Sequence, residues 1–156
     1  MKLTILVGTM TGTAQLVAQE LELAWDGEGV DVETLLMDGL DSSVFGRDGV
    51  FLVCTSTYGQ GDVPDNAKKL YDDLAAMRPG LSHVRYGVFG LGDCTYAETF
   101  NFGGMKFDTL LGELGAQRIG ERIQHDASSG VLPEEKAEEW AEGWLAQARE
   151  AAAQTA

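Results

Sequence analysis

The first residues whose types and spacing suggest chemistry form a loop, residues 8–14, after the apolar run 3–7. The loop reads Gly-Thr-Met-Thr-Gly-Thr-Ala, and a segment with helical periodicity begins at its end. A helix N-terminus presents unpaired backbone N–H groups and a partial positive charge. Hydroxyl side chains at such a turn are suited to bind a phosphate. The loop contains no Lys or Arg, so N–H groups and hydroxyls would have to hold the anion.

The common nucleotide-binding motifs do not match this loop. A Walker A loop requires a Lys after its second Gly, and that Lys is missing. The dinucleotide motif requires Gly-x-Gly-x-x-Gly, whereas Gly8 and Gly12 are four residues apart with no third Gly to complete the set. An ordinary strand-to-helix turn with Thr11 or Thr13 as the N-cap explains the same residues. The loop alone therefore leaves a phosphate site and a capped turn as alternatives.

Two later loops, residues 55–66 and 90–101, add aromatic and glycine residues. The first reads Thr-Ser-Thr-Tyr-Gly-Gln-Gly-Asp-Val-Pro-Asp-Asn and the second reads Gly-Leu-Gly-Asp-Cys-Thr-Tyr-Ala-Glu-Thr-Phe-Asn. Tyr58 and Tyr96 each stand beside glycines, which allow a backbone to approach a ligand closely. A single loop tyrosine is more often a packed surface aromatic. Two rings together with a phosphate loop favour a flat, phosphorylated ring system that stacks between them.

The elements that must position these loops follow from hydrophobic periodicity. Continuous apolar runs predict strands, and apolar residues spaced three or four apart predict helices with one buried face. Residues 31–36 alternate and predict an edge strand, whereas residues 49–54 predict a strand covered on both faces. The predicted strands are 3–7, 31–36, 49–54, 85–91 and 117–124, and helices are predicted over 14–28, from Pro64 to Pro79, around 107–115, and from about Pro133 onward. Residues 37–48 and 92–104 are predicted to be connections.

Alternating strands and helices predict a five-stranded parallel sheet with helices on both faces, a three-layer α/β/α sandwich. We expect one domain over residues 1–150 and a frayed tail over residues 151–156. In the strand order 2-1-3-4-5, the loops after strands 1, 3 and 4 leave neighbouring strands. Ligands of open α/β sheets bind beyond the carboxyl ends of the strands. The three loops should therefore converge on one site.

Charge and cysteine content narrow the partners and the compartment. The 156-residue chain has 25 acidic against 11 basic residues, a formal charge of −14. Such a chain should repel nucleic acids and anionic membranes and attract proteins with basic patches. No apolar run is long enough for a membrane span or a signal peptide. Cys54 and Cys94 form no Cys-x-x-Cys motif, which favours a reducing cytoplasm. His83 and His125 are isolated and give little support to a metal site.

The three loops together resemble those of short-chain flavodoxins. The likeness extends to MioC-type flavodoxin-like proteins of bacteria and to the FMN domains of diflavin reductases such as the sulfite reductase flavoprotein. The matching stretches are residues 9–14, residues 56–62 with 65–66, and residues 91–96. Residues 114–116 and the acidic, Trp-containing last helix also match, so the resemblance covers nearly the whole chain. The insertion that splits the last strand of long-chain flavodoxins is absent.

The resemblance implies FMN as the cofactor and assigns the loops to its parts. Residues 9–14 would hold the phosphate, residues 56–59 would pass along the isoalloxazine, and residues 91–96 would line its other side, with Asn101 near the end of that loop. Tyr58 and Tyr96 would stack on the two faces. The implied cofactor-binding residues are Thr9, Met10, Thr11, Gly12, Thr13, Ala14, Ser56, Thr57, Tyr58, Gly59, Leu91, Gly92, Asp93, Tyr96, Phe100, Asn101 and Asp126.

The resemblance also implies a monomeric FMN electron carrier. Such a protein shuttles single electrons between a flavin-dependent reductase, of the ferredoxin or flavodoxin reductase type, and an acceptor enzyme. We see no positioned acid–base pair or nucleophile in the sequence, so no catalytic residue is assigned and no substrate turnover is expected. The alternative is a self-sufficient FMN-dependent NAD(P)H oxidoreductase, which would need room for a nicotinamide over the flavin.

Overall fold

The structure is a computed structural model that describes residues 2–9, 12–56, 63–92, 102–126 and 129–155. Its strands form one parallel sheet in the order β2-β1-β3-β4-β5. Strand β5 pairs with the start of β4, and β6 pairs with the end of β4. The strands are β1 (Lys2–Gly8), β2 (Asp31–Leu36), β3 (Val50–Thr55), β4 (Arg85–Gly92), β5 (Gln117–Arg118) and β6 (Ile123–Asp126). The predicted strand order is confirmed.

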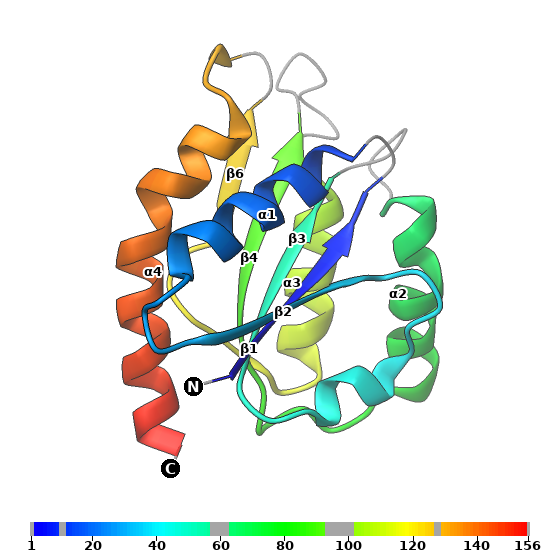
Figure 1. Cartoon of the computed structure of the whole chain (residues 1–156). Helices are drawn as coiled ribbons and strands as arrows, with labels where there is room; N and C mark the ends of the chain where they lie inside the picture. The colour runs from blue at the N-terminus through cyan, green and yellow to red at the C-terminus, as the bar shows by residue number, and fades with distance from the viewer. Residues whose placement is uncertain (1, 10–11, 57–62, 93–101, 127–128, 156) are drawn as a thin grey trace.

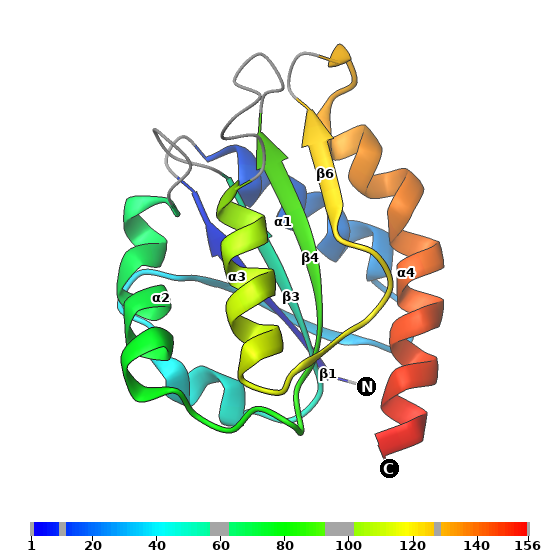
Figure 2. The ribbon, with the colours of Figure 1, turned by 180° about the vertical axis from the view of Figure 1, so that it is seen from behind.

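Helices cover both faces of the sheet. Helices α1 (Thr13–Trp25) and α4 (Pro133–Thr155) pack on one face, and α2 (Asp65–Met77) and α3 (Phe102–Glu113) pack on the other, as the two opposite views show (Figure 1 and Figure 2). A short 3₁₀ helix, η1 (Ser42–Gly46), lies within the predicted connection 37–48. The three-layer α/β/α prediction is therefore confirmed. No helix within the described ranges combines the length and apolarity needed to cross a membrane.

The burial of the strands explains their sequences. All six residues of β3 are buried, which matches its continuous apolar run and its place between β1 and β4. The edge strand β2 alternates between exposed and partly buried residues, as its alternating sequence predicts. In α1 the buried positions are Ala14, Val17, Ala18, Leu21 and Trp25, a single stripe that packs on the sheet.

The predicted strand 117–124 is interrupted, so the prediction of one continuous strand is wrong. Tyr86 on β4 pairs with Arg118, and Phe89 on β4 pairs with Ile123. The chain therefore advances five positions from Arg118 to Ile123 (123 − 118) while β4 advances three (89 − 86), so the extra residues bulge out of the sheet. The carbonyl of Ile119 accepts a hydrogen bond from the indole N–H of Trp144 at 3.0 Å. That bond turns the Ile119 carbonyl toward α4, and the strand resumes as β6.

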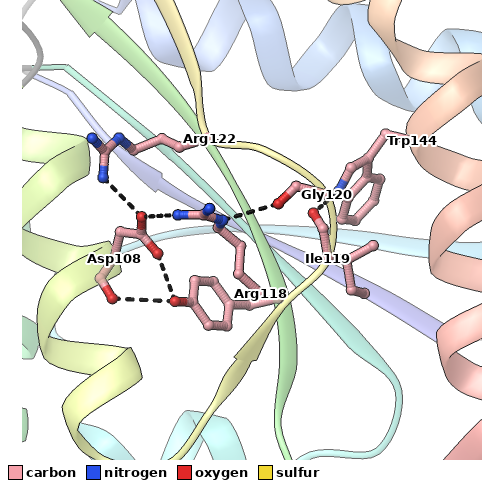
Figure 3. A network of polar contacts seen from close by, with 7 residues as sticks. Asp108, Arg118, Ile119, Gly120, Arg122 and Trp144 are labelled. Atoms are coloured by element: carbon pink, nitrogen blue, oxygen red, sulfur yellow. Dashed lines mark hydrogen bonds and ion pairs between the residues drawn. The ribbon is translucent and has the colours of Figure 1, made fainter.

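A polar network under α3 holds this interruption in place (Figure 3). Asp108 is 8% exposed, and its Oδ2 accepts hydrogen bonds from Arg118 Nη1 at 2.5 Å and from Arg122 Nη1 at 2.8 Å. The Tyr86 hydroxyl donates to Asp108 Oδ1 at 2.6 Å. Burial, followed by the hydrogen bond to Asp108, raises the pKa of Tyr86 well above its usual range, so the hydroxyl stays a donor. The network ties α3 to β4, β5 and the connection before β6.

Helix α1 ends at Trp25, three residues before the predicted end at residue 28, and the boundaries of α3 and α4 also differ from the predictions. The predicted loop 92–104 is too long because α3 already begins at Phe102. A Cβ added to Gly104 would lie 3.3 Å from Gly90 Cα, so a small residue there lets the first turn of α3 lie close to β4. Helix α4 continues to Thr155, into the segment expected to fray. The expected fraying and the 1–150 domain boundary stay predictions.

Candidate cofactor site at the carboxyl edge of the sheet

The carboxyl ends of β1, β3, β4 and β6 lie at one edge of the sheet (Figure 1). Gly8 pairs with Thr55, Thr55 with Gly90, and Gly90 with Gln124, so these four residues form one row across the sheet. Strands β1 and β3 end at this row, and β4 and β6 continue as a pair for two more residues, to Gly92 and Asp126. The structure therefore brings the starts of the predicted loops to one edge.

Eight of the predicted site residues belong to the described part of the chain: Thr9, Gly12, Thr13, Ala14, Ser56, Leu91, Gly92 and Asp126. The others lie outside the described residues, and they are Met10, Thr11, Thr57, Tyr58, Gly59, Asp93, Tyr96, Phe100 and Asn101. Their assignments to the cofactor stay predictions.

The turn after β1 is closed by Gly12 rather than by a threonine cap. Gly12 is the N-cap of α1, with a φ of +91° that favours glycine. Its N–H donates to Thr9 Oγ1 at 2.8 Å. The alternative with Thr13 as the N-cap is therefore wrong, because α1 begins at Thr13 itself. Since Gly12 has no side-chain acceptor and the first turn of α1 has no acidic residue, no carboxylate of that turn offsets the positive helix end.

Gly8 and Ser56 join the exits of β1 and β3. The backbone N–H of Ser56 donates to the Gly8 carbonyl at 3.0 Å. A Cβ on Gly8 would lie 2.6 Å from Thr55 Oγ1 and 3.2 Å from Met37 Sδ. Packing therefore requires glycine at position 8, and the first residue of each loop leaves from a fixed place.

Two predicted site residues point their side chains into the core. Ala14 is fully buried, and its carbonyl accepts a hydrogen bond from Cys54 Sγ at 3.4 Å. Burial raises the pKa of Cys54 far above its usual range, so this thiol stays neutral. Leu91 is 5% exposed and belongs to the core cluster under α1 and α4. Ala14 and Leu91 can therefore meet a ligand at this edge only through their backbones.

Asp126 lies on the strand beside the start of the third loop. It pairs with Gly92, so the structure brings together two predicted site residues from β6 and β4. Asp126 is partly buried at the carboxyl end of β6. A carboxylate is thereby placed at the same edge as the turn after β1.

Asn66 is the functional candidate that sequence reasoning did not assign. It stands in the first turn of α2, and its Oδ1 accepts a hydrogen bond from Thr9 N at 2.8 Å. Its Nδ2 lies 3.2 Å from both the Val7 carbonyl and Asp38 Oδ2. The Asp-Asn pair was part of the matching pattern, but nothing in the sequence shows that its amide reaches the other loop, 57 positions away.

Comparisons with known proteins agree with this arrangement. The model of the flavodoxin family matches residues 5–140. The flavodoxin YqcA of Escherichia coli K12 is 39% identical over 140 residues, which cover 90% of this chain and 93% of that protein. The protein MioC of the same strain is 35% identical over 146 residues, which cover 92% of this chain and 95% of that protein.

A solved structure shows the same fold over nearly the whole length. A cysteine-to-alanine mutant of a flavodoxin from Pseudomonas aeruginosa superposes with a TM-score of 0.85 and 36% identity, covering 96% of this chain and 99% of that one. The family model, the relatives and the fold agree with one another and with the resemblance seen in the loops. The chain therefore belongs to the flavodoxin family of FMN-binding electron-transfer proteins.

Proposed function

We propose that this chain is a single-electron carrier that accepts electrons from a flavin-dependent reductase and passes them to an acceptor enzyme. FMN supplies the one-electron redox chemistry when bound. The observation that carries the proposal is the turn between β1 and α1. There the Gly12 N–H donates to Thr9 Oγ1, next to a helix N-terminus whose first turn contains no carboxylate. The Thr9 hydroxyl and the positive end of α1 suit a phosphate monoester such as that of FMN.

In this proposal each loop has a separate task. Thr9–Ala14, with Met10 and Thr11 between them, bind the phosphate through hydroxyl and backbone N–H groups. Ser56–Gly59 follow one side of the ring system, and Leu91–Asp93 with Tyr96 follow the other. The fixed exits at Gly8 and Gly92 set where these loops begin. Tyr58 and Tyr96 stack on the ring and limit the access of water and of a nicotinamide to its faces.

The charge of the chain supports a partner with a basic surface. A formal charge of −14 raises the rate at which a positively charged protein meets this one, and salt weakens the effect. Asp126 adds a carboxylate at the carboxyl edge of the sheet, where we place the cofactor. We therefore propose a cytoplasmic, monomeric carrier that docks basic redox proteins of the reductase and acceptor type. Substrate turnover of its own is not part of the proposal.

The choice between a carrier and a self-sufficient oxidoreductase can be tested with NADPH. The FMN-loaded protein should bleach slowly with NADPH alone and rapidly once a catalytic amount of a ferredoxin or flavodoxin reductase is added. Stopped-flow absorbance of the flavin measures both rates. The rate with the reductase should also fall as salt is raised, because attraction between the two surfaces is screened. Rapid bleaching by NADPH alone, with turnover of a quinone, would favour the oxidoreductase.

A further inference from the structure

The side chain of Asn66 connects three segments that are far apart in the sequence. Its Oδ1 accepts a hydrogen bond from the backbone N–H of Thr9 at 2.8 Å. Its Nδ2 donates toward the Val7 carbonyl, the last but one residue of β1, and toward the Asp38 carboxylate after β2, both at 3.2 Å. The Asn66 amide thus bonds to the residue before Gly8 and to the residue after it.

These contacts allow only one orientation of the Asn66 amide. A carbonyl and an ionised carboxylate can only accept hydrogen bonds, and a backbone N–H can only donate. If the amide turned over, its oxygen would face two acceptors and its NH₂ would face a donor. The pattern therefore fixes both the side chain of Asn66 and the backbone of Thr9.

The bond to Thr9 also determines which of its groups can serve a ligand. The Thr9 N–H is already donated to Asn66, and Thr9 Oγ1 accepts from Gly12 N at 2.8 Å. A hydroxyl that accepts one hydrogen bond can still donate its own hydrogen. The hydroxyl of Thr9, rather than its N–H, therefore still has a hydrogen to donate to an anion.

We infer that Asn66 is a positioning residue that shapes the phosphate turn before FMN arrives, and so sets the preference for phosphorylated over unphosphorylated flavin. The inference rests on the proposed function, in which residues 9–14 bind the phosphate. Since Thr9 and Gly12 are already held in place, they lose less conformational freedom on binding, and more of the interaction with the phosphate is retained as affinity. Asn66 acts through Thr9 and Gly12, whereas the ring system is held by the other loops.

The substitution Asn66→Ala tests this by comparing two flavins. Dissociation constants for FMN and riboflavin are measured by quenching of flavin fluorescence on the full-length apoprotein. The preference for FMN over riboflavin should fall by about tenfold, because binding must then also fix the backbone of Thr9, and fixing one residue costs on the order of a tenfold factor in a binding constant. The affinity for riboflavin should stay within about twofold, well below the tenfold that corresponds to one hydrogen bond. An unchanged preference would contradict the inference.

Asp73→Ala is the matched control. Asp73 also lies on α2, and its Oδ2 accepts a hydrogen bond from Ser42 N at 2.7 Å, so this variant loosens the same helix without touching Thr9. Its preference for FMN should equal that of the wild type. A similar fall of the preference in both variants would show that general loosening of α2, rather than the bond to Thr9, is responsible.

Hydrogen exchange in the wild-type apoprotein gives a second test that does not depend on a variant. The Thr9 amide should already be protected without flavin and gain little when FMN is added. Exchange at the rate of an unprotected amide in the apoprotein would contradict the inference. A wild-type protein that fails to bind FMN would instead overturn the proposed function, and one that binds FMN and riboflavin equally would overturn the phosphate assignment.

Discussion

Replacing Asp108 by Ala should lower the free energy of unfolding by about 3 kcal/mol, because removal of one partner leaves the charges of a largely buried ion network uncompensated. Arg118 and Arg122 both donate to Asp108 Oδ2, at 2.5 and 2.8 Å. The side chains of these arginines are 39% and 21% exposed, so water solvates part of their charge, and we place the cost at the lower end of the usual range. Urea unfolding followed by circular dichroism measures the change.

The variant also removes the acceptor of the Tyr86 hydroxyl, which would keep only the Asp108 carbonyl at 3.1 Å. Glu113→Ala is the control on the same helix. Glu113 meets Arg78 at 3.7 Å with both side chains 54% exposed, and such pairs contribute less than about 1 kcal/mol. Equal losses in the two variants would mean that the Asp108 network adds nothing beyond a surface ion pair.

Replacing Gly87 by Ala should cost about 3 kcal/mol, at the upper end of what overpacking a core usually costs. A Cβ on Gly87 would lie 2.6 Å from Trp144 Cζ2 and Nε1, closer than real Cβ atoms come to other atoms. The Trp144 ring has little freedom to move away. It is 2% exposed, its N–H donates to the Ile119 carbonyl, and Trp25 and Trp140 lie 5.7 and 5.2 Å from it between ring centroids. The thermal midpoint and urea unfolding measure the loss.

Gly143→Ala is the matched control for that substitution, since a Cβ at Gly143, next to Trp144 on α4, meets nothing within 4 Å. It should stabilise the protein by up to about 1 kcal/mol, the difference between Gly and Ala in a helix interior. The double variant Gly87→Ala with Trp144→Phe should lose less than the sum of its parts, because the smaller ring makes room for the new methyl. Additive losses would show that the contact with Trp144 is not the cause.

The strands, and the edge position of β2, could be predicted because burial leaves a direct trace in the sequence. β3 is covered on both faces and reads as an unbroken apolar run, while β2 at the edge alternates. The order of strands then places the three loops at one edge without further information. The interruption between β5 and β6 could not be predicted, since it depends on a hydrogen bond that Trp144 donates to the Ile119 carbonyl, 25 positions away.

In the site, too, features that depend on neighbouring residues could be predicted, and contacts between distant segments could not. The turn after β1 was recognised from its threonines and glycines, but Gly12 as the N-cap requires a positive φ that the sequence does not display. The bond between Asn66 and Thr9 joins loops that only the packed sheet brings together. Ala14 and Leu91 were assigned to the cofactor by the resemblance, and the packing of α1 and β4 turns both side chains into the core.

The most direct measurement for the central claim is a titration of the ¹⁵N-labelled apoprotein with FMN, followed by amide chemical shifts. The proposed site predicts that the shifts change most at the carboxyl edge, at Thr9, Gly12, Ser56, Gly92 and Asp126. Residues at the amino edge of the sheet should not respond. That edge holds a hollow of about 470 Å³ lined by polar groups that include Arg47, His83 and Arg85, which makes it the natural internal comparison.

Changes confined to the carboxyl edge would support an FMN site built from the turn after β1 and the loops after β3 and β4. Changes centred on Arg47, His83 and Arg85, or spread evenly over the chain, would contradict it.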